Sequence, residues 1–248
     1  MSDRDSGSPM DPDRRAPMWR VDLHSHTYES PDAGTSPEQL VERALTVGLD
    51  RIAVTDHGSI DGALAARELA PERVIIGEEI RCRCGTELIG LFLQESIPMR
   101  RCLEEVVERI RDQGGVIYAP HPYAYPWRPM WRARRALEVS DLVEAVNARA
   151  FFPPWNRAAG RGGSRRKLPL AAGSDAHFPG EIGRAFTRMP AFCDPGSFLA
   201  AVGAARPVWV ATTGPGAHVR STGLKMARSA SALANRLRPY PQPQPAEP

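Results

Sequence analysis

Asp22-Leu23-His24-Ser25-His26 is the most informative stretch for the fold, because it follows directly on an apolar run typical of a β-strand. Two later apolar runs end in the same way, in Thr55-Asp56-His57-Gly58 and in Gly173-Ser174-Asp175-Ala176-His177. The chain holds 6 histidines, and those in strand-end phrases are His24, His26, His57, His121 and His177. The carboxyl ends of parallel strands meet at one edge of a sheet, where α/β enzymes build their sites. We therefore expect imidazoles and carboxylates to gather at one such edge.

Strand and helix patterns alternate along the chain. Ser36-Pro37-Glu38-Gln39 predicts the start of a helix, with Ser36 as its cap and Gln39 completing a capping box, and Gly48 predicts its end. Further helices are expected over 60–69, 99–113 and 195–203, strands over 19–24, 49–55, 73–76, 116–119, 141–146, 168–172 and 207–211, and a hairpin over 79–93 that turns near 84–86. This alternation favours a parallel sheet, barrel-like or doubly wound. Suggestive residues at several strand ends favour a barrel with its site at one face.

The composition is that of an ordinary folded protein. A chain of 248 residues can bury one large core, or at most two small ones. We expect a disordered leader over 1–18, one catalytic domain over 19–211, and a C-terminal segment over 212–248 that is basic, partly helical and then Pro-rich and disordered. No apolar run approaches the roughly 18 residues that cross a bilayer, and the polar N-terminus lacks the apolar middle of a signal peptide, so we expect a cytoplasmic protein.

Cysteine and charge patterns add less. Cys82 and Cys84 alternate on an expected strand, and no further ligands follow at zinc-site spacing, so all 4 cysteines are expected to be unpaired and reduced. The net charge of +3 is too small to indicate nucleic-acid binding. Arginines do cluster over 128–135 and 157–167. These clusters are either solvated surface or an anion-attracting rim around a site.

The strand-end residues suit metal binding. His24 and His26 lie two apart on extended chain, so both rings point the same way and can hold one borderline metal, although a structural role is equally compatible with the pair alone. Glu78 and Glu79 point to opposite faces, so at most one faces the site. Asp56 is expected to support a histidine ligand rather than to bind metal. Histidines mixed with carboxylates suit two or three divalent ions, as in the two-metal logic of phosphoester hydrolysis.

These phrases together resemble the PHP (polymerase and histidinol phosphatase) family of metal-dependent phosphoesterases. Residues 22–27 are similar to the first family motif, residues 55–62 to the second, and Ile76-Gly77-Glu78-Glu79-Ile80 to the Gly-x-Glu motif, which selects Glu79. Pro120-His121-Pro122 and residues 173–177 resemble the third and fourth motifs. The resemblance covers roughly residues 19–210 and implies a distorted (β/α)7 barrel with a di- or trinuclear centre of manganese, zinc or iron.

The resemblance also implies a set of ligands. One metal would be held by His24, His26, Glu79 and Asp175; a second by Glu79 and His121; and a third by His57, His177 and Asp32. The chain departs from the family twice. Asp32 stands one residue later than the usual acid, and no histidine lies between His57 and His121, so Glu87 or Glu95 would have to substitute there or the centre would hold two metals. His218 is expected to be non-catalytic.

The implied activity is hydrolysis of a phosphate ester by a metal-activated hydroxide, with Asp175, His177 and Arg184 as catalytic residues. Arg149 and Arg184 are the expected phosphate-binding residues, because guanidinium binds phosphate in a two-pronged way. The expected substrate is a small phosphorylated metabolite or a nucleotide. Two alternatives stay open: a nuclease that trims 3′ ends, using Tyr123, Tyr125, Trp127, Trp131 and Trp155 among the arginines, and a non-catalytic binding module.

Overall fold

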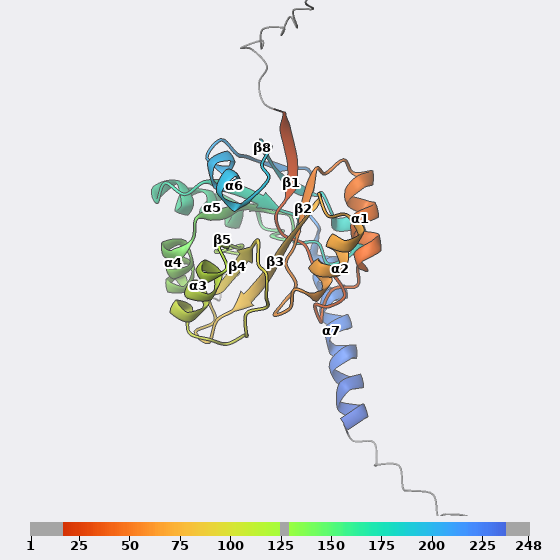
Figure 1. Cartoon of the computed structure of the whole chain (residues 1–248). Helices are drawn as coiled ribbons and strands as arrows, with labels where there is room; N and C mark the ends of the chain where they lie inside the picture. The colour runs from red at the N-terminus through yellow and green to blue at the C-terminus, as the bar shows by residue number, and fades with distance from the viewer. Residues whose placement is uncertain (1–16, 125–128, 237–248) are drawn as a thin grey trace, which may run out of the picture.

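One continuous sheet organises the computed structural model, which describes residues 17–124 and 129–236 (Figure 1). The order of the strands in the sheet is β7-β6-β5-β4-β3-β2-β1-β8-β9. Its described strands are β1 Met18–Asp22, β2 Arg51–Val54, β3 Val74–Arg81, β4 Glu87–Leu91, β5 Val116–Ala119, β6 Leu142–Asn147, β7 Leu170–Gly173, β8 Ala185–Pro190 and β9 Arg206–Trp209.

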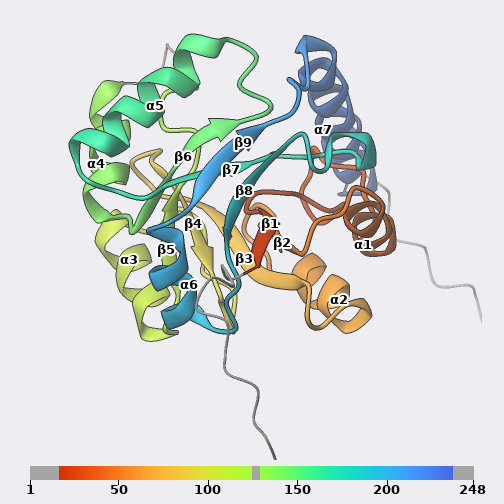
Figure 2. The same cartoon turned by 90° about the horizontal axis from the view of Figure 1, so that it is seen from above.

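The first seven strands form a nearly closed barrel. β1, β2 and β3 run parallel, β5, β6 and β7 run parallel, and β4 is antiparallel to both of its neighbours. The chain just after β1 then pairs with the chain just after β7: the His26 amide donates to the Ala176 carbonyl at 2.8 Å, and the Asp175 amide donates to the His24 carbonyl at 2.8 Å. β8 and β9 are antiparallel additions beside β1 (Figure 2). The expected α/β fold, a distorted (β/α)7 barrel, is confirmed.

Helices surround this barrel (Figure 2). The capping box at Ser36 and Gln39 is formed as predicted. The helices are α1 Pro37–Thr46, α2 Asp61–Leu69, α3 Leu103–Asp112, α4 Met130–Val139, α5 Pro153–Arg165, α6 Pro195–Val202 and α7 Pro215–Arg236, with a short 3-10 helix, η1, at Pro179–Glu181.

The expectations about elements need correction at one helix boundary and at α4, α5 and β8, which were not predicted. The helix predicted over 99–113 begins only at Leu103, because Arg100 lies in the left-handed region (φ 63°) and the Cys102 sulfur caps the helix. α5 was not predicted, since its Gly160, Gly162 and Gly163 have low intrinsic helix propensity. A Cβ at Gly163 would overlap Val143 of β6, so this glycine lets α5 pack closely on the sheet.

The buried residues explain why the polar site lies at one end of the barrel. An apolar interior layer includes Leu23, Ile89 and Tyr118, and Phe198 of α6 joins it. A second layer fills the space between the sheet and helices α1, α2 and α3. With the interior filled by apolar side chains, the polar residues after the strands lie at the carboxyl end.

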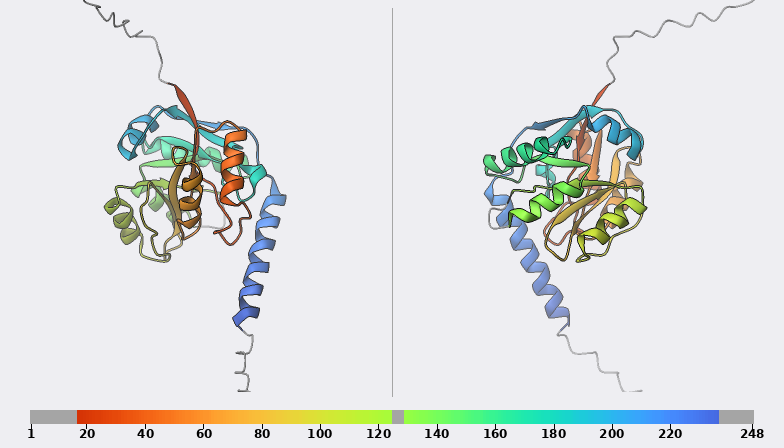
Figure 3. Two further views of the ribbon diagram at one scale, coloured as in Figure 1. Left: turned by 45° about the vertical axis from the view of Figure 1, so that its right-hand side comes forward. Right: turned by 90° about the vertical axis from the view of Figure 1, so that its left-hand side faces the viewer.

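The expected catalytic domain over 19–211 stays a prediction. Met18 already belongs to β1, and most of the expected leader (1–16) and the final stretch (237–248) lie outside the described residues. Helix α7, expected to belong to a separate C-terminal segment, begins beside the barrel and projects past it (Figure 3). Among the described residues, no helix is both long and apolar enough to cross a membrane. The four cysteines are unpaired, as expected.

Gly62 of α2 offers a test of this packing. A Cβ there would overlap the Thr27 hydroxyl and the Asp56 carboxylate, whereas a Cβ at Gly223 of α7 would meet nothing within 4 Å. We expect Gly62→Ala to lower the free energy of unfolding by about 1–3 kcal/mol through overpacking. Gly223→Ala should be neutral or stabilising by up to about 1 kcal/mol. Urea denaturation of both variants measures this, and equal stabilities would contradict the packing described here.

Candidate metal centre

Side chains from several strand ends converge on a cavity of about 470 Å³ at the carboxyl end of the barrel. Its lining includes Asp32, His57, Glu79, His121, Asp175 and His177, all expected as ligands from the sequence. His24 and His26 lie directly beneath, fully buried against the same carboxylates. The three strand-end phrases therefore form one site.

Glu79 is the centre of this cluster. Its Oε2 atom lies 3.3 Å from His24 Nε2, 3.5 Å from His26 Nε2 and 3.3 Å from His57 Nδ1. Its Oε1 atom lies 3.2 Å from His121 Nε2. Because the two oxygens face different histidines, this one carboxylate can bridge neighbouring ions. Glu78 points the other way and accepts hydrogen bonds from Ile97 and Ser96, as the alternation of the strand requires.

Three groups of ligand atoms lie close enough together to hold an ion, and they overlap, because His24 and His26 each belong to two of them. The groups are His24, His26 and Asp175; His24, Glu79 and His121; and His26, His57 and His177. The donors are imidazole nitrogens and carboxylate oxygens without a thiolate, which suits zinc, manganese or iron.

Asp32 completes the third group. Its Oδ1 atom lies 3.6 Å from both His57 Nε2 and His177 Nε2, and it is buried without a hydrogen-bond partner. A buried carboxylate oxygen normally has a partner. An ion held between these three side chains would satisfy it, so the residues present fit a metal at this position.

The protonation of the histidines and Glu79 also fits a site where bound metal ions take the place of protons. Burial holds the pKa of His57 and His177 below the usual histidine value, which favours neutral rings that offer lone pairs. Burial lowers the pKa of His121, but Glu79 outweighs this and brings it to about 9. Burial raises the pKa of Glu79, yet His57 and His121 hold it well below its usual range. Metal ligands must be deprotonated, so metal would displace the His121 proton.

A layer of hydrogen bonds orients the histidines. Asp56 accepts from the Thr27 amide and hydroxyl and from Ser30 Oγ at 2.6–2.7 Å. Ser30 Oγ thereby accepts from His26 Nδ1 at 3.2 Å, which turns His26 Nε2 toward Glu79. Asp56 thus reaches His26 through Ser30, and its role in supporting a metal ligand stays a prediction.

Glu144 is a functional residue that the sequence reasoning missed. It is fully buried on β6, and its Oε1 atom accepts from His24 Nδ1 at 3.0 Å. Its Oε2 atom accepts from the His121 amide at 2.8 Å and from Asn147 Nδ2 at 2.9 Å. The signal was a lone acid inside the otherwise apolar strand Leu142–Asn147.

The structure separates the two expected phosphate-binding arginines. Arg149 lines the cavity, with its guanidinium 3.2 Å from Glu181 Oε2 and from Ser221 Oγ. Arg184 does not line it: its guanidinium donates to the Gly180 and Thr212 carbonyls. Arg184 belongs to the turn before β8, and these bonds stabilise that turn, so its expected contact with phosphate stays a prediction.

The structure also locates the other residues that the sequence analysis considered. Glu87 lines the cavity, 4.0 Å from His121 Nδ1, whereas Glu95 is exposed and holds the Gln113 side chain through its amide. His218 of α7 lines the cavity. Arg157, Arg161 and Arg165 line a separate, open depression on α5. Tyr125 and Trp127 lie outside the described residues.

Sequence comparison identifies the family. A sequence model of the PHP domain matches residues 22–118, and a model described as PHP-associated matches residues 153–207. The chain belongs to the PHP family. An uncharacterized protein of Methanocaldococcus jannaschii is 39% identical over 142 residues, which are 52% of this chain and 82% of the archaeal protein.

Solved structures of other proteins share the fold. A two-domain protein from Bacteroides vulgatus, containing a predicted PHP-like metal-dependent phosphoesterase, superposes with a TM-score of 0.63 at 21% identity. The match covers 78% of this chain and 65% of that protein. A lesion-specific endonuclease from Pyrococcus furiosus superposes with a TM-score of 0.57 at 14% identity. That match covers 77% of this chain and 58% of the endonuclease chain. PHP-type relatives imply divalent metals, and the three ligand groups provide places for them.

Replacing Glu144 tests the orienting layer. Glu144→Gln keeps the shape of the side chain but removes the negative charge opposite His24 Nδ1, so we expect metal affinity to fall about 10–100-fold. Glu138→Gln is the matched control, because Glu138 lies on the surface of α4 and pairs with exposed Arg134. Titration with manganese, followed by calorimetry, measures both. Equal affinities would show that Glu144 does not orient the ligands.

Proposed function

We propose that this protein is a metal-dependent phosphoesterase that hydrolyses the phosphate ester of a small phosphorylated metabolite or nucleotide. The observation that carries the proposal is Glu79, whose two carboxylate oxygens face separate histidine groups beneath an open cavity. Ions bridged by one carboxylate lie close enough to act on the same phosphate. Family membership supports this reaction class, and manganese, zinc or iron suits the donor set.

When bound, the ions supply Lewis-acid activation of water and charge for the phosphate oxygens. The chain's own residues hold the ligand side chains and orient their donor atoms. Asp175 is held through Oδ2 by the Asn147 amide at 3.2 Å, leaving Oδ1 toward His24 and His26. His177 donates from Nδ1 to the Asp175 carbonyl at 2.9 Å, so its Nε2 lone pair faces Asp32.

Arg149 is the described arginine best placed to balance phosphate charge. It is almost fully buried, and Glu181 and Ser221 fix its guanidinium, so little side-chain freedom is left to lose when substrate binds. A fixed cation beside the reacting group stabilises charge that builds up on phosphate oxygens.

A nuclease is the second candidate, favoured by two surface features. Phe151 and Phe152 are about half exposed and pack on Trp155, and Phe151 stacks edge-on against His218 at the cavity. The α5 arginines add an open basic surface. Aromatic faces can stack nucleobases, and arginines can contact phosphates. Faster hydrolysis of short oligonucleotides than of mononucleotides and sugar phosphates would favour this candidate.

Asp175→Asn tests the proposed chemistry. Asp175 has a left-handed backbone (φ 53°), which asparagine adopts readily, so the fold should survive. An amide is a poorer metal ligand than a carboxylate, and we expect hydrolysis of phosphomonoesters with manganese to fall at least about 100-fold. Asp112→Asn, at the exposed end of α3, should keep full activity. Undiminished turnover by Asp175→Asn would rule out the assignment.

A further inference from the structure

Helix α7 contributes one complete face to the cavity. His218, Ser221, Thr222 and Lys225 all line it, and their spacing of three and four residues places them on one side of a helix. This helix lies beyond both segments matched by the family models, which end at residues 118 and 207. Neither family model therefore covers this face.

Several bonds fix α7 against the barrel. Ser221 is buried and accepts from Arg149 Nη2 at 3.2 Å, and His218 Nε2 donates to the Arg149 carbonyl at 3.0 Å. Farther along, Arg228 donates to the carbonyls of Tyr28 and Ser30 at 3.1 and 2.7 Å. The helix is thus tied both to the strand end after β6 and to the loop that carries Asp32.

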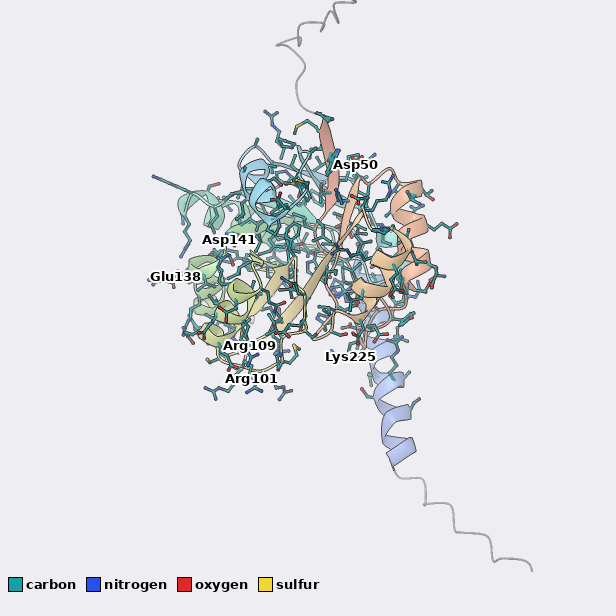
Figure 4. All side chains as sticks on the ribbon, viewed as in Figure 1. Asp50, Arg101, Arg109, Glu138, Asp141 and Lys225 are labelled. Carbon is teal, nitrogen blue, oxygen red and sulfur yellow. The ribbon has the colours of Figure 1, made fainter. Side chains whose placement is uncertain are left out.

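Lys225 lies between these two anchors, on the part of α7 nearest the barrel (Figure 4). Its ammonium is 3.7 Å from Asp32 Oδ2, and its side chain is 55% exposed, so it remains open to the cavity. The other Asp32 oxygen faces His57 and His177. A carboxylate that binds metal through this second oxygen has less negative charge to offer Lys225, which is then left for another anion.

The kind of cation matters at this position. The chain has 32 lysine and arginine residues together, of which only Lys167 and Lys225 are lysine. Among the described lining residues the full cations are Arg81, Arg149 and Lys225, and Arg149 is already bonded to Glu181. A lysine ammonium is a compact point charge on a flexible stem, which suits a phosphate oxygen beside metal ions.

We propose that α7 forms part of the substrate site and that Lys225 binds a phosphate oxygen of the substrate. This inference rests on the proposed phosphoesterase function for its ligand class. It assigns a substrate-binding role to a helix that the sequence placed in a separate tail.

Binding of inorganic phosphate to the manganese-loaded full chain tests this, measured by calorimetry. We expect Lys225→Met to weaken phosphate binding at least about 10-fold, while Lys225→Arg, which keeps the charge, stays within about 3-fold of the wild type. Lys167→Met removes the same charge from the exposed turn after α5 and should leave phosphate binding unchanged. Unchanged phosphate binding by Lys225→Met would overturn the proposal. So would loss of bound metal in that variant, since Lys225 would then act through Asp32.

Amine labelling gives a readout that does not depend on turnover. The chain has two lysines, so Lys167 serves as the internal reference for Lys225. Phosphate should slow acylation of Lys225 several-fold in the metal-loaded protein and leave Lys167 unaffected. Equal acylation of Lys225 with and without phosphate would contradict the inference. The proposed function fails separately: a wild-type protein that binds phosphate through Lys225 but hydrolyses no phosphate ester would refute only the enzymatic activity.

Discussion

The buried carboxylate of Glu79 is the constraint on which the site depends. It is 2% exposed and lies within 3.5 Å of nitrogen atoms from four histidines. A buried charge with no partner costs several kcal/mol, so the histidines and Glu79 need each other or metal ions. Glu79 sits mid-strand in β3, which extends through the Gly-x-Glu phrase into the hairpin with β4. The register of that hairpin therefore fixes where the centre forms.

The closure of the barrel delivers the remaining ligands to Glu79. The pairing of residues 24–26 with 174–176 brings the first and fourth motifs together across 150 residues of sequence. Gly173 makes this approach feasible, because a Cβ there would overlap His24 and crowd the Glu144 carboxylate. Asp22 adds to the closure by accepting from the Ser174 and Gly183 amides. Packing and site geometry thus depend on the same few contacts.

Much of this arrangement was predictable from the sequence. The features that were not predicted were missed for physical reasons. Alternation of strand and helix, the capping box at Ser36 and the histidine phrases follow from local patterns, so the barrel and most ligands were expected. Arg184 lies away from the cavity, since sequence distance from Asp175 says nothing about which carbonyls a side chain will reach. Glu144 stood out as a lone acid in an apolar strand, but its partners, like the α7 face, depend on tertiary contacts, which no local periodicity encodes.

The central claim is that the strand-end phrases build one polynuclear metal centre around Glu79. Anomalous X-ray diffraction from crystals of the full chain grown with manganese tests it most directly. The account predicts at least two manganese peaks, with the Glu79 carboxylate bridging two of them and His24, His26 and Asp175 bonded to one. No peak among these side chains, or a single ion that Glu79 does not touch, would contradict it.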